Sequence, residues 1–209
     1  MHVTDWQGWH RQYADPTSSL SRRLQVVRQL LRDLVADLGP AQRVLSLCAG
    51  DGRDILPVLA ARPPEQRPEL VLVELDPELA AAAQHAAASA GVRTTVVVGD
   101  AGLSATWQEH LPADLLMLCG IFGNVPDEHI ARTIASASSM LTPGGAVIWT
   151  RGAFGDRDIR PQIRQWFSDS GFEELGFEAE PHGYGVGVNR AGSTVSAGTL
   201  PAQLFTFGR

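Results

Sequence analysis

The residues whose types and spacing could do chemistry begin with the run at 43–54, RVLSLCAGDGRD. A short apolar strand there breaks into a turn of small residues that contains Gly50 and Gly52, and a helical stretch follows. Glycine has no Cβ, so such a turn lets the backbone approach a ligand closely. The free N–H groups of the following helix start face the same ligand. The run therefore predicts a ligand-binding turn.

Two acidic residues follow at the spacing expected of a nucleotide-type site. Glu74 ends the next strand, in LVLVELDPEL, and Asp100 follows the strand after that, in TTVVVGDA. Together with the turn they indicate an adenosine-containing cofactor at the carboxyl edge of a parallel sheet. A dinucleotide fingerprint would need glycine where Ile55 or Cys48 stands, and a phosphate loop ending in Lys-Ser/Thr is absent from the sequence.

The elements that must position these residues alternate between strand and helix from position 43 onward. Strands are expected at 44–48, 70–75, 94–98, 114–119 and 146–150, and helices at 53–62, 77–90, 104–110, 127–141 and 159–170. Such alternation with short connections predicts a parallel sheet with helices on both faces. Three extended segments close the chain, FEELGFEAE, YGVGVNR and QLFTFGR, and antiparallel pairing at the sheet edge is expected for them. The predicted fold is one doubly wound, Rossmann-like α/β domain with a mostly parallel seven-stranded sheet and an antiparallel C-terminal edge.

An amphipathic helix precedes this unit. Asp15 is expected to cap it and Pro16 to occupy its first position, and Gly39-Pro40 ends it. Apolar residues recur between these points at intervals of three and four. Four arginines lie largely off that stripe and are expected on a solvated face: Arg22, Arg23, Arg28 and Arg32.

Bulk properties exclude several classes of function. The net charge of −6 argues against a strong non-specific nucleic-acid binder, and no apolar stretch reaches membrane-spanning length. The N-terminus has neither the basic start nor the apolar core of a secretory signal. Cys48 and Cys119 belong to no Cys-x-x-Cys pair, so no metal site is expected. The expectation is a reduced, cytoplasmic protein with no nucleic-acid or membrane partner.

The chain resembles the class I S-adenosylmethionine (SAM) dependent methyltransferases over about residues 40 to 150. It looks most like a group of small actinobacterial methyltransferases of unassigned substrate, to which the flanks WxxWHxxY-x-DP and IWTR are also similar. The glycine motif of the family reads acid-x-Gly-x-Gly-x-Gly, and Ser46, Cys48, Gly50 and Gly52 occupy those positions here. In the family the acid helps to hold the amino group of the cofactor. Ser46 cannot supply that charge, so recognition of the amine must come from elsewhere.

The resemblance also implies roles for the later acids. Glu74 matches the acid that accepts from both ribose hydroxyls, an arrangement suited to a vicinal diol. Asp76 is its rival, although Asp76-Pro77 reads as a helix start. Asp100 matches the acid near the adenine amine, and the Ala101 N–H would donate to the ring. Further cofactor contacts are expected at Ala49, Gly50, Gly52 and Cys119.

Substrate-side residues follow from the resemblance as well. Asn124, after the fourth strand, would face the transferred methyl group; the alternative is a loop residue in a left-handed turn. Residues 1–40 would form an N-terminal lid segment and helix, and residues 41–209 the cofactor-binding domain, in one compact unit. In the lid, His10 could act as general base and Tyr13 could bind substrate or cofactor; the alternatives are a surface histidine and a packed aromatic.

Arg151, after the fifth strand, could hold a substrate carboxylate or phosphate. It could equally pair with Asp156 or Asp158.

The activity implied is methyl transfer from SAM to a small-molecule acceptor by in-line displacement, with S-adenosylhomocysteine as product. Aminopropyl or aminocarboxypropyl transfer or cyclisation is the alternative, for which Ser46 is the one hint. A non-catalytic SAM-binding protein is another. Methylation of RNA or protein is disfavoured by the acidic balance and the lack of an appended binding domain. A homodimer stays open, since the aromatic N-terminus could exchange between protomers.

Overall fold

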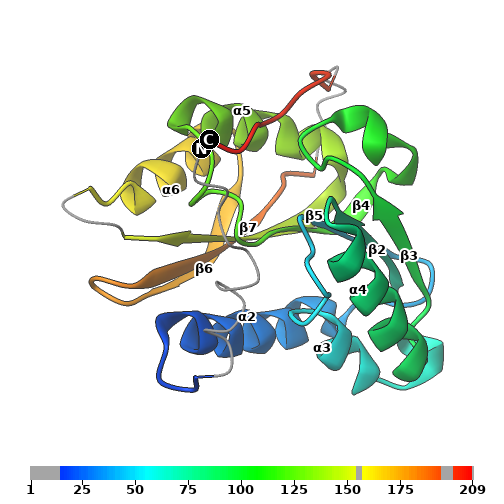
Figure 1. The fold of residues 1–209 in the computed structure, drawn as a ribbon. Coiled ribbons are helices and arrows are strands. Elements are labelled where there is room, and N and C mark those ends of the chain that lie inside the picture. Colours follow the sequence, from blue (N-terminus) through cyan, green and yellow to red (C-terminus); the bar gives the residue numbers. More distant parts are fainter. Residues whose placement is uncertain (1–14, 154–156, 194–199, 209) are drawn as a thin grey trace.

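The computed structural model describes residues 15–153, 157–193 and 200–208 and is built on a seven-stranded sheet. The strand order is β3-β2-β1-β4-β5-β7-β6 (Figure 1). The first five strands in this order pair in parallel, and β7 runs antiparallel to β5 and β6. The strands are β1 Arg43–Leu47, β2 Glu69–Glu74, β3 Thr94–Val98, β4 Ala113–Leu118, β5 Leu141–Gly152, β6 Glu173–Ala179 and β7 Tyr184–Arg190. The predicted fold class is confirmed, including the antiparallel C-terminal edge.

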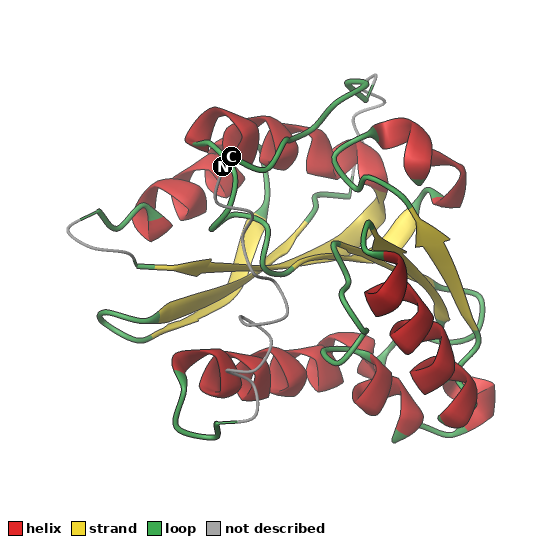
Figure 2. Cartoon of the chain, viewed as in Figure 1, coloured by secondary structure: helices red, strands yellow, loops and turns green. Residues whose placement is uncertain are grey.

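Helices cover both faces of the sheet (Figure 2), with α2, α3 and α4 below it in this view and α5 and α6 above it. The longer helices are α2 Ser19–Ala36, α3 Leu56–Ala60, α4 Pro77–Ser89, α5 Asp127–Ala137 and α6 Arg160–Asp169. Short 3-10 turns lie at η2 Pro64–Gln66, η3 Ser104–Thr106, η4 Gln108–His110 and η5 Ser138–Met140. None of the helices that the structure describes is long and apolar enough to cross a membrane.

The sheet separates two hydrophobic cores because successive strand residues point to opposite faces. In β2, Leu70 and Leu72 pack with residues of α2, α3 and α4, whereas Val71 and Val73 pack with residues of α5 and α6. All four are fully buried. The same alternation in β1 and β4 leaves both faces of the central strands apolar, as in sheets that are covered on both sides.

Trp149 of β5 joins the C-terminal strands to the core on the α5–α6 side of the sheet. Its ring is fully buried, stacks on Phe167 of α6 and on Phe177 of β6 at centroid distances of 5.8 Å each, and donates from Nε1 to Oδ1 of Asn189 at 2.8 Å. Aromatic packing with a satisfied indole N–H fixes the position of the antiparallel edge. Gly187 of β7 lies directly opposite Trp149 in the ladder and leaves room for the ring.

The expected start of the first helix, with Asp15 as its cap, is wrong. Helix α2 begins at Ser19 and is capped by Ser18, whose hydroxyl accepts from the N–H of Ser21 at 3.0 Å. Asp15 instead closes the preceding turn, because its Oδ1 accepts from both the N–H and the hydroxyl of Thr17. A side chain that satisfies a local turn is not available to the helix two residues later.

The third C-terminal segment, QLFTFGR, is not a strand of the sheet within the described residues. It makes a single bridge between Gln203 and Leu103, and it buries Leu204 and Phe205 in the core on the α5 side. Its alternating apolar residues pack against the loop after β3, and its described residues form no ladder of hydrogen bonds with a strand.

Substituting Gly187 tests this packing of β7 on β5. A Cβ at Gly187 would lie 2.3 Å from two ring atoms of Trp149, whereas a Cβ at Gly176 of β6 would meet nothing within 4 Å. We expect Gly187→Ala to lower the free energy of unfolding by roughly 1–3 kcal/mol, the usual cost of overpacking a core. Gly176→Ala is the matched control and should cause no loss. Urea denaturation measures both, and equal effects would contradict the packing described.

Candidate functional site

The turn after β1 has a left-handed backbone at alternate residues. The φ angles are 55° at Cys48, 57° at Gly50 and 73° at Gly52. A Cβ at Gly52 would lie 2.7 Å from Cδ1 of Leu56, so this position is restricted by packing as well as by conformation. Cys48 adopts the same conformation with a side chain, at a cost of about 1–2 kcal/mol. The turn predicted from the sequence is therefore present, and it holds the backbone of residues 48–52 at the carboxyl end of β1.

Glu74 connects this turn to the turn after β2. Its Oε2 accepts from the N–H of Gly50 at 2.7 Å, and its Oε1 accepts from the N–H of Asp76 at 2.9 Å. Each carboxylate oxygen retains capacity for one more hydrogen bond. Asp76 is used differently, since its Oδ1 accepts from the N–H groups of Glu78 and Leu79 and caps α4. The predicted helix start at Asp76-Pro77 is confirmed.

Asp100 organises the turn after β3. Its Oδ1 accepts from the N–H of Gly102 at 2.8 Å, and its backbone oxygen accepts from the hydroxyl of Thr106. The next residue, Ala101, is buried, and its carbonyl accepts from the indole N–H of Trp107 at 2.9 Å. This turn is thus fixed by a local side chain and by a core tryptophan.

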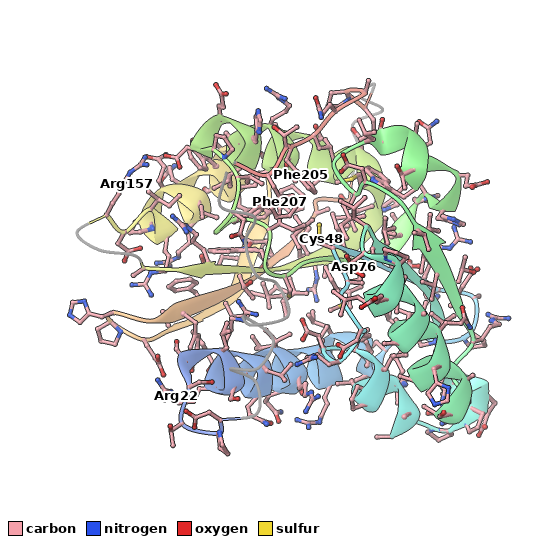
Figure 3. All side chains as sticks on the ribbon, viewed as in Figure 1. Arg22, Cys48, Asp76, Arg157, Phe205 and Phe207 are labelled. Carbon is pink, nitrogen blue, oxygen red and sulfur yellow. The ribbon has the colours of Figure 1, made fainter. Side chains whose placement is uncertain are left out.

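The C-terminal segment 200–208 ties the Asp100 turn to the region after β4. The N–H of Leu204 donates to Gly102 at 2.8 Å, and the N–H of Gly208 donates to Asn124 at 2.9 Å. In the view of Figure 3, Phe205, Phe207, Cys48 and Asp76 follow one another from this segment toward α4. Sequence reasoning placed this segment at the sheet edge and missed these contacts, because their partners lie 84 and 102 residues away along the chain and leave no local pattern.

The electrostatic surroundings of the two cysteines divide the site. Burial raises the pKa of Cys48, and the carboxylates of Glu74 and Asp100 raise it further. Burial likewise raises the pKa of Cys119, with Asp54 raising it and Arg23 lowering it. Cys48, Glu74 and Asp100 therefore form one group, the Glu74 half. Asp54, Cys119 and Arg23 form another, the Asp54 half.

The Asp54 half lies where α2 meets the glycine turn. Nε and Nη2 of Arg28 donate to the carbonyl of Arg53 at 3.1 and 2.8 Å, and Arg53 in turn binds the carboxylate of Asp51 at 2.6 Å. Arg23 is close enough to Asp54 to lower the pKa of that carboxyl, which burial raises. Sequence analysis had assigned Arg23 and Arg28 to a solvated face. That was wrong, because both are half-buried against the turn.

Asn124 closes a local turn. Its Nδ2 donates to the carbonyl of Gly120 at 2.7 Å, and Gly120 rather than Asn124 adopts the left-handed conformation, with φ 80°. The alternative of a left-handed asparagine is therefore wrong. Whether Asn124 also contacts a substrate stays a prediction.

Arg151 lies within β5, opposite Gly185 of β7, and not after the strand as expected, because β5 extends to Gly152. Its side chain is half-buried. Burial lowers the pKa of its guanidinium, opposed by the nearby carboxylates of Asp127 and Asp158. Arg160 binds the carboxylate of Asp158 at 2.6 Å, so the hydrogen bonds of Asp158 go to Arg160. Three residues of the sequence analysis lie outside the described residues: His10, Tyr13 and Asp156.

Comparison with known proteins decides the class of the site. Residues 44–145 match the sequence profile of the methyltransferase domain family. Residues 44–145 therefore form a methyltransferase domain. The matched span contains the glycine turn, Glu74 and Asp100, so the cofactor that this domain family implies is SAM. A search of curated protein sequences found no match.

Solved structures share the fold at low sequence identity. Magnesium protoporphyrin IX methyltransferase from Synechocystis PCC 6803, solved with bound SAM, is 16% identical with a TM-score of 0.65, and the match covers 90% of this chain and 92% of that one. An O-methyltransferase family protein from Burkholderia thailandensis is 19% identical with a TM-score of 0.60, covering 90% and 69%. The [4+2]-cyclase SpnF is 17% identical with a TM-score of 0.58, covering 80% of each chain. These likenesses support the methyltransferase fold but identify no acceptor.

Thiol labelling tests the division of the site. Because burial and two carboxylates hold the pKa of Cys48 above its usual range, Glu74→Gln should lower that pKa and speed iodoacetamide labelling of Cys48 roughly three- to tenfold at pH 8.5, as expected for removal of one nearby charge. Cys119, whose charged neighbours are Asp54 and Arg23, is the internal control and should not change. Peptide mass spectrometry reads both sites. Equal acceleration of the two thiols would contradict the division.

Proposed function

We propose that this protein transfers the methyl group of SAM to a small-molecule acceptor. The observation that carries the proposal is the meeting of three turns at one edge of the sheet. The N–H of Gly50 in the glycine turn donates to Glu74, and the carboxylates of Glu74 and Asp100 both raise the pKa of Cys48 in that turn. When bound, SAM supplies a methyl group activated by its sulfonium.

The described residues suit the adenosine part of this cofactor. Glu74 has both oxygens anchored by backbone N–H groups and can accept from two ribose hydroxyls. Asp100 has one oxygen bound to Gly102 and the other for the adenine amine, next to the Ala101 backbone. We favour Glu74 over Asp76 as the ribose ligand because the cap of α4 occupies Asp76.

The acceptor is proposed to be small because the carboxyl edge is already partly covered. The segment 200–208 crosses from Gly102 to Asn124. Asn124 and Arg151 stand on the substrate side, the latter as a half-buried guanidinium suited to a carboxylate or phosphate. The protein then contributes alignment of the nucleophile and exclusion of water. A general base is required only for an acceptor that must lose a proton.

Paired substitutions test the ribose assignment. We expect Glu74→Gln to raise the dissociation constant for SAM about tenfold or more, since a charge-assisted hydrogen bond contributes roughly 1.5–3 kcal/mol. Asp76→Ala is the matched control. It should cost about 1 kcal/mol of stability through the lost cap and leave SAM affinity unchanged. Calorimetric titration measures affinity, and the reverse pattern would assign the ribose to Asp76.

Product analysis tests the reaction itself. The protein would be incubated with SAM and a panel of small hydroxyl, amine and carboxylate acceptors, and the nucleoside product identified by mass spectrometry. Methyl transfer yields S-adenosylhomocysteine in step with a methylated acceptor. Methylthioadenosine as the product would instead establish aminopropyl or aminocarboxypropyl transfer or cyclisation.

A further inference from the structure

Asp54 differs from every other acid around the glycine turn. The carboxylate of Asp51 binds Arg53, that of Glu74 binds two backbone N–H groups, and that of Asp76 caps α4. Asp54, by contrast, accepts no hydrogen bond within residues 15–153, 157–193 and 200–208. The residue as a whole is half-buried, beside the glycine turn.

An unpaired carboxylate in the interior is costly unless a ligand compensates it. Burial raises the pKa of Asp54, which records that cost, and Arg23, Arg28 and Arg53 offset part of it. Perturbed acids of this kind gather at functional sites. The arginines compensate the charge only in part, so a bound cation would complete the compensation.

The position of Asp54 matches one end of the proposed cofactor. Glu74 and Asp100 occupy the half of the site suited to adenosine, and Asp54 belongs to the other half with Cys119 and Arg23. SAM carries an α-ammonium group at the end opposite its adenine. An ammonium group needs acceptors and is held best by an ionised one.

Position 46 offers no such charge. Ser46 pairs in register with Leu72 and Met117, both of which belong to the core on the α2–α4 side, so its buried side chain faces that layer. Cys119 packs against the same core, and Asp54 lies two residues before the start of α3, which helps to form it. The serine and Asp54 therefore lie on the same side of the sheet, and the negative charge is on Asp54.

We propose that Asp54 binds the α-ammonium group of the cofactor, in place of a charge that Ser46 cannot provide. This inference rests on the proposed function, because it takes SAM as the ligand. Asp54 is a cofactor-binding residue in this account and takes no part in moving a proton.

Discrimination between two ligands tests the assignment. S-adenosylhomocysteine carries the ammonium group, and methylthioadenosine shares its adenosine and thioether but lacks the amino-acid portion. We expect Asp54→Asn to raise the dissociation constant for S-adenosylhomocysteine about tenfold or more, as for loss of a charge-assisted hydrogen bond, and that for methylthioadenosine less than about twofold, both by calorimetry at pH 7.5. Asp51→Asn, three residues earlier in the same turn, is the matched control and should leave the ratio of the two constants unchanged.

Two results would overturn the inference. If Asp54→Asn weakens both ligands equally or neither, Asp54 does not contact the ammonium group, and the adenosine site stands without it. If the unsubstituted protein binds neither ligand, the cofactor assignment fails and this inference fails with it.

Thermal stability separates a binding role from a structural one. Because burial disfavours the charged carboxylate, Asp54→Asn should keep or raise the melting temperature of the ligand-free protein at pH 7.5. The gain should shrink as the pH falls through the raised pKa, where the aspartate becomes neutral. A lower melting temperature would mark Asp54 as a structural residue and contradict the proposal.

The ionisable groups that act on Asp54 are Arg23 and Arg28 of α2, Asp51 and Arg53 of the turn, and Cys119 after β4.

Discussion

The rest of the site depends on one carboxylate that joins two turns. Glu74 accepts from the N–H of Gly50 in the turn after β1 and from that of Asp76 in the turn after β2. Parallel pairing of β1 with β2 brings the ends of these strands to the same edge, and the hydrogen bonds then fix the two turns relative to each other. Gly50, which is left-handed, donates its N–H to the acid. A ligand that uses both turns meets a site that is already assembled.

The charges at this edge are arranged so that most are already compensated. Arg53 neutralises Asp51, Arg28 holds the carbonyl of Arg53, and backbone N–H groups hold Glu74. Asp54 stands apart from this arrangement. Because the interior disfavours an unpaired charge, Asp54 is the acid that most suggests a bound ligand. It lies in the half of the site where Ser46 replaces the acid of the glycine motif.

The architecture could be predicted well from the sequence because the central strands carry continuous apolar runs and alternate with helical segments. β2 and β3 end within one residue of their expected ends, and Asp76 caps α4 as its dipeptide with Pro77 predicted. What could not be predicted depends on long-range contacts. Ser18 and not Asp15 caps α2, because Asp15 forms its hydrogen bonds within its own turn. The last segment packs on the Asp100 turn and does not add a strand to the sheet. Arg23 and Arg28 looked solvated because no local pattern records the glycine turn that lies beside them.

The central claim is that the two halves of this edge bind the two ends of one SAM molecule. A crystal structure of the protein with S-adenosylhomocysteine tests it most directly. The account predicts ribose hydroxyls within hydrogen-bonding distance of Glu74, the adenine beside Asp100 and Ala101, and the ammonium group beside Asp54. Adenosine bound away from Glu74 and Asp100 would contradict the account.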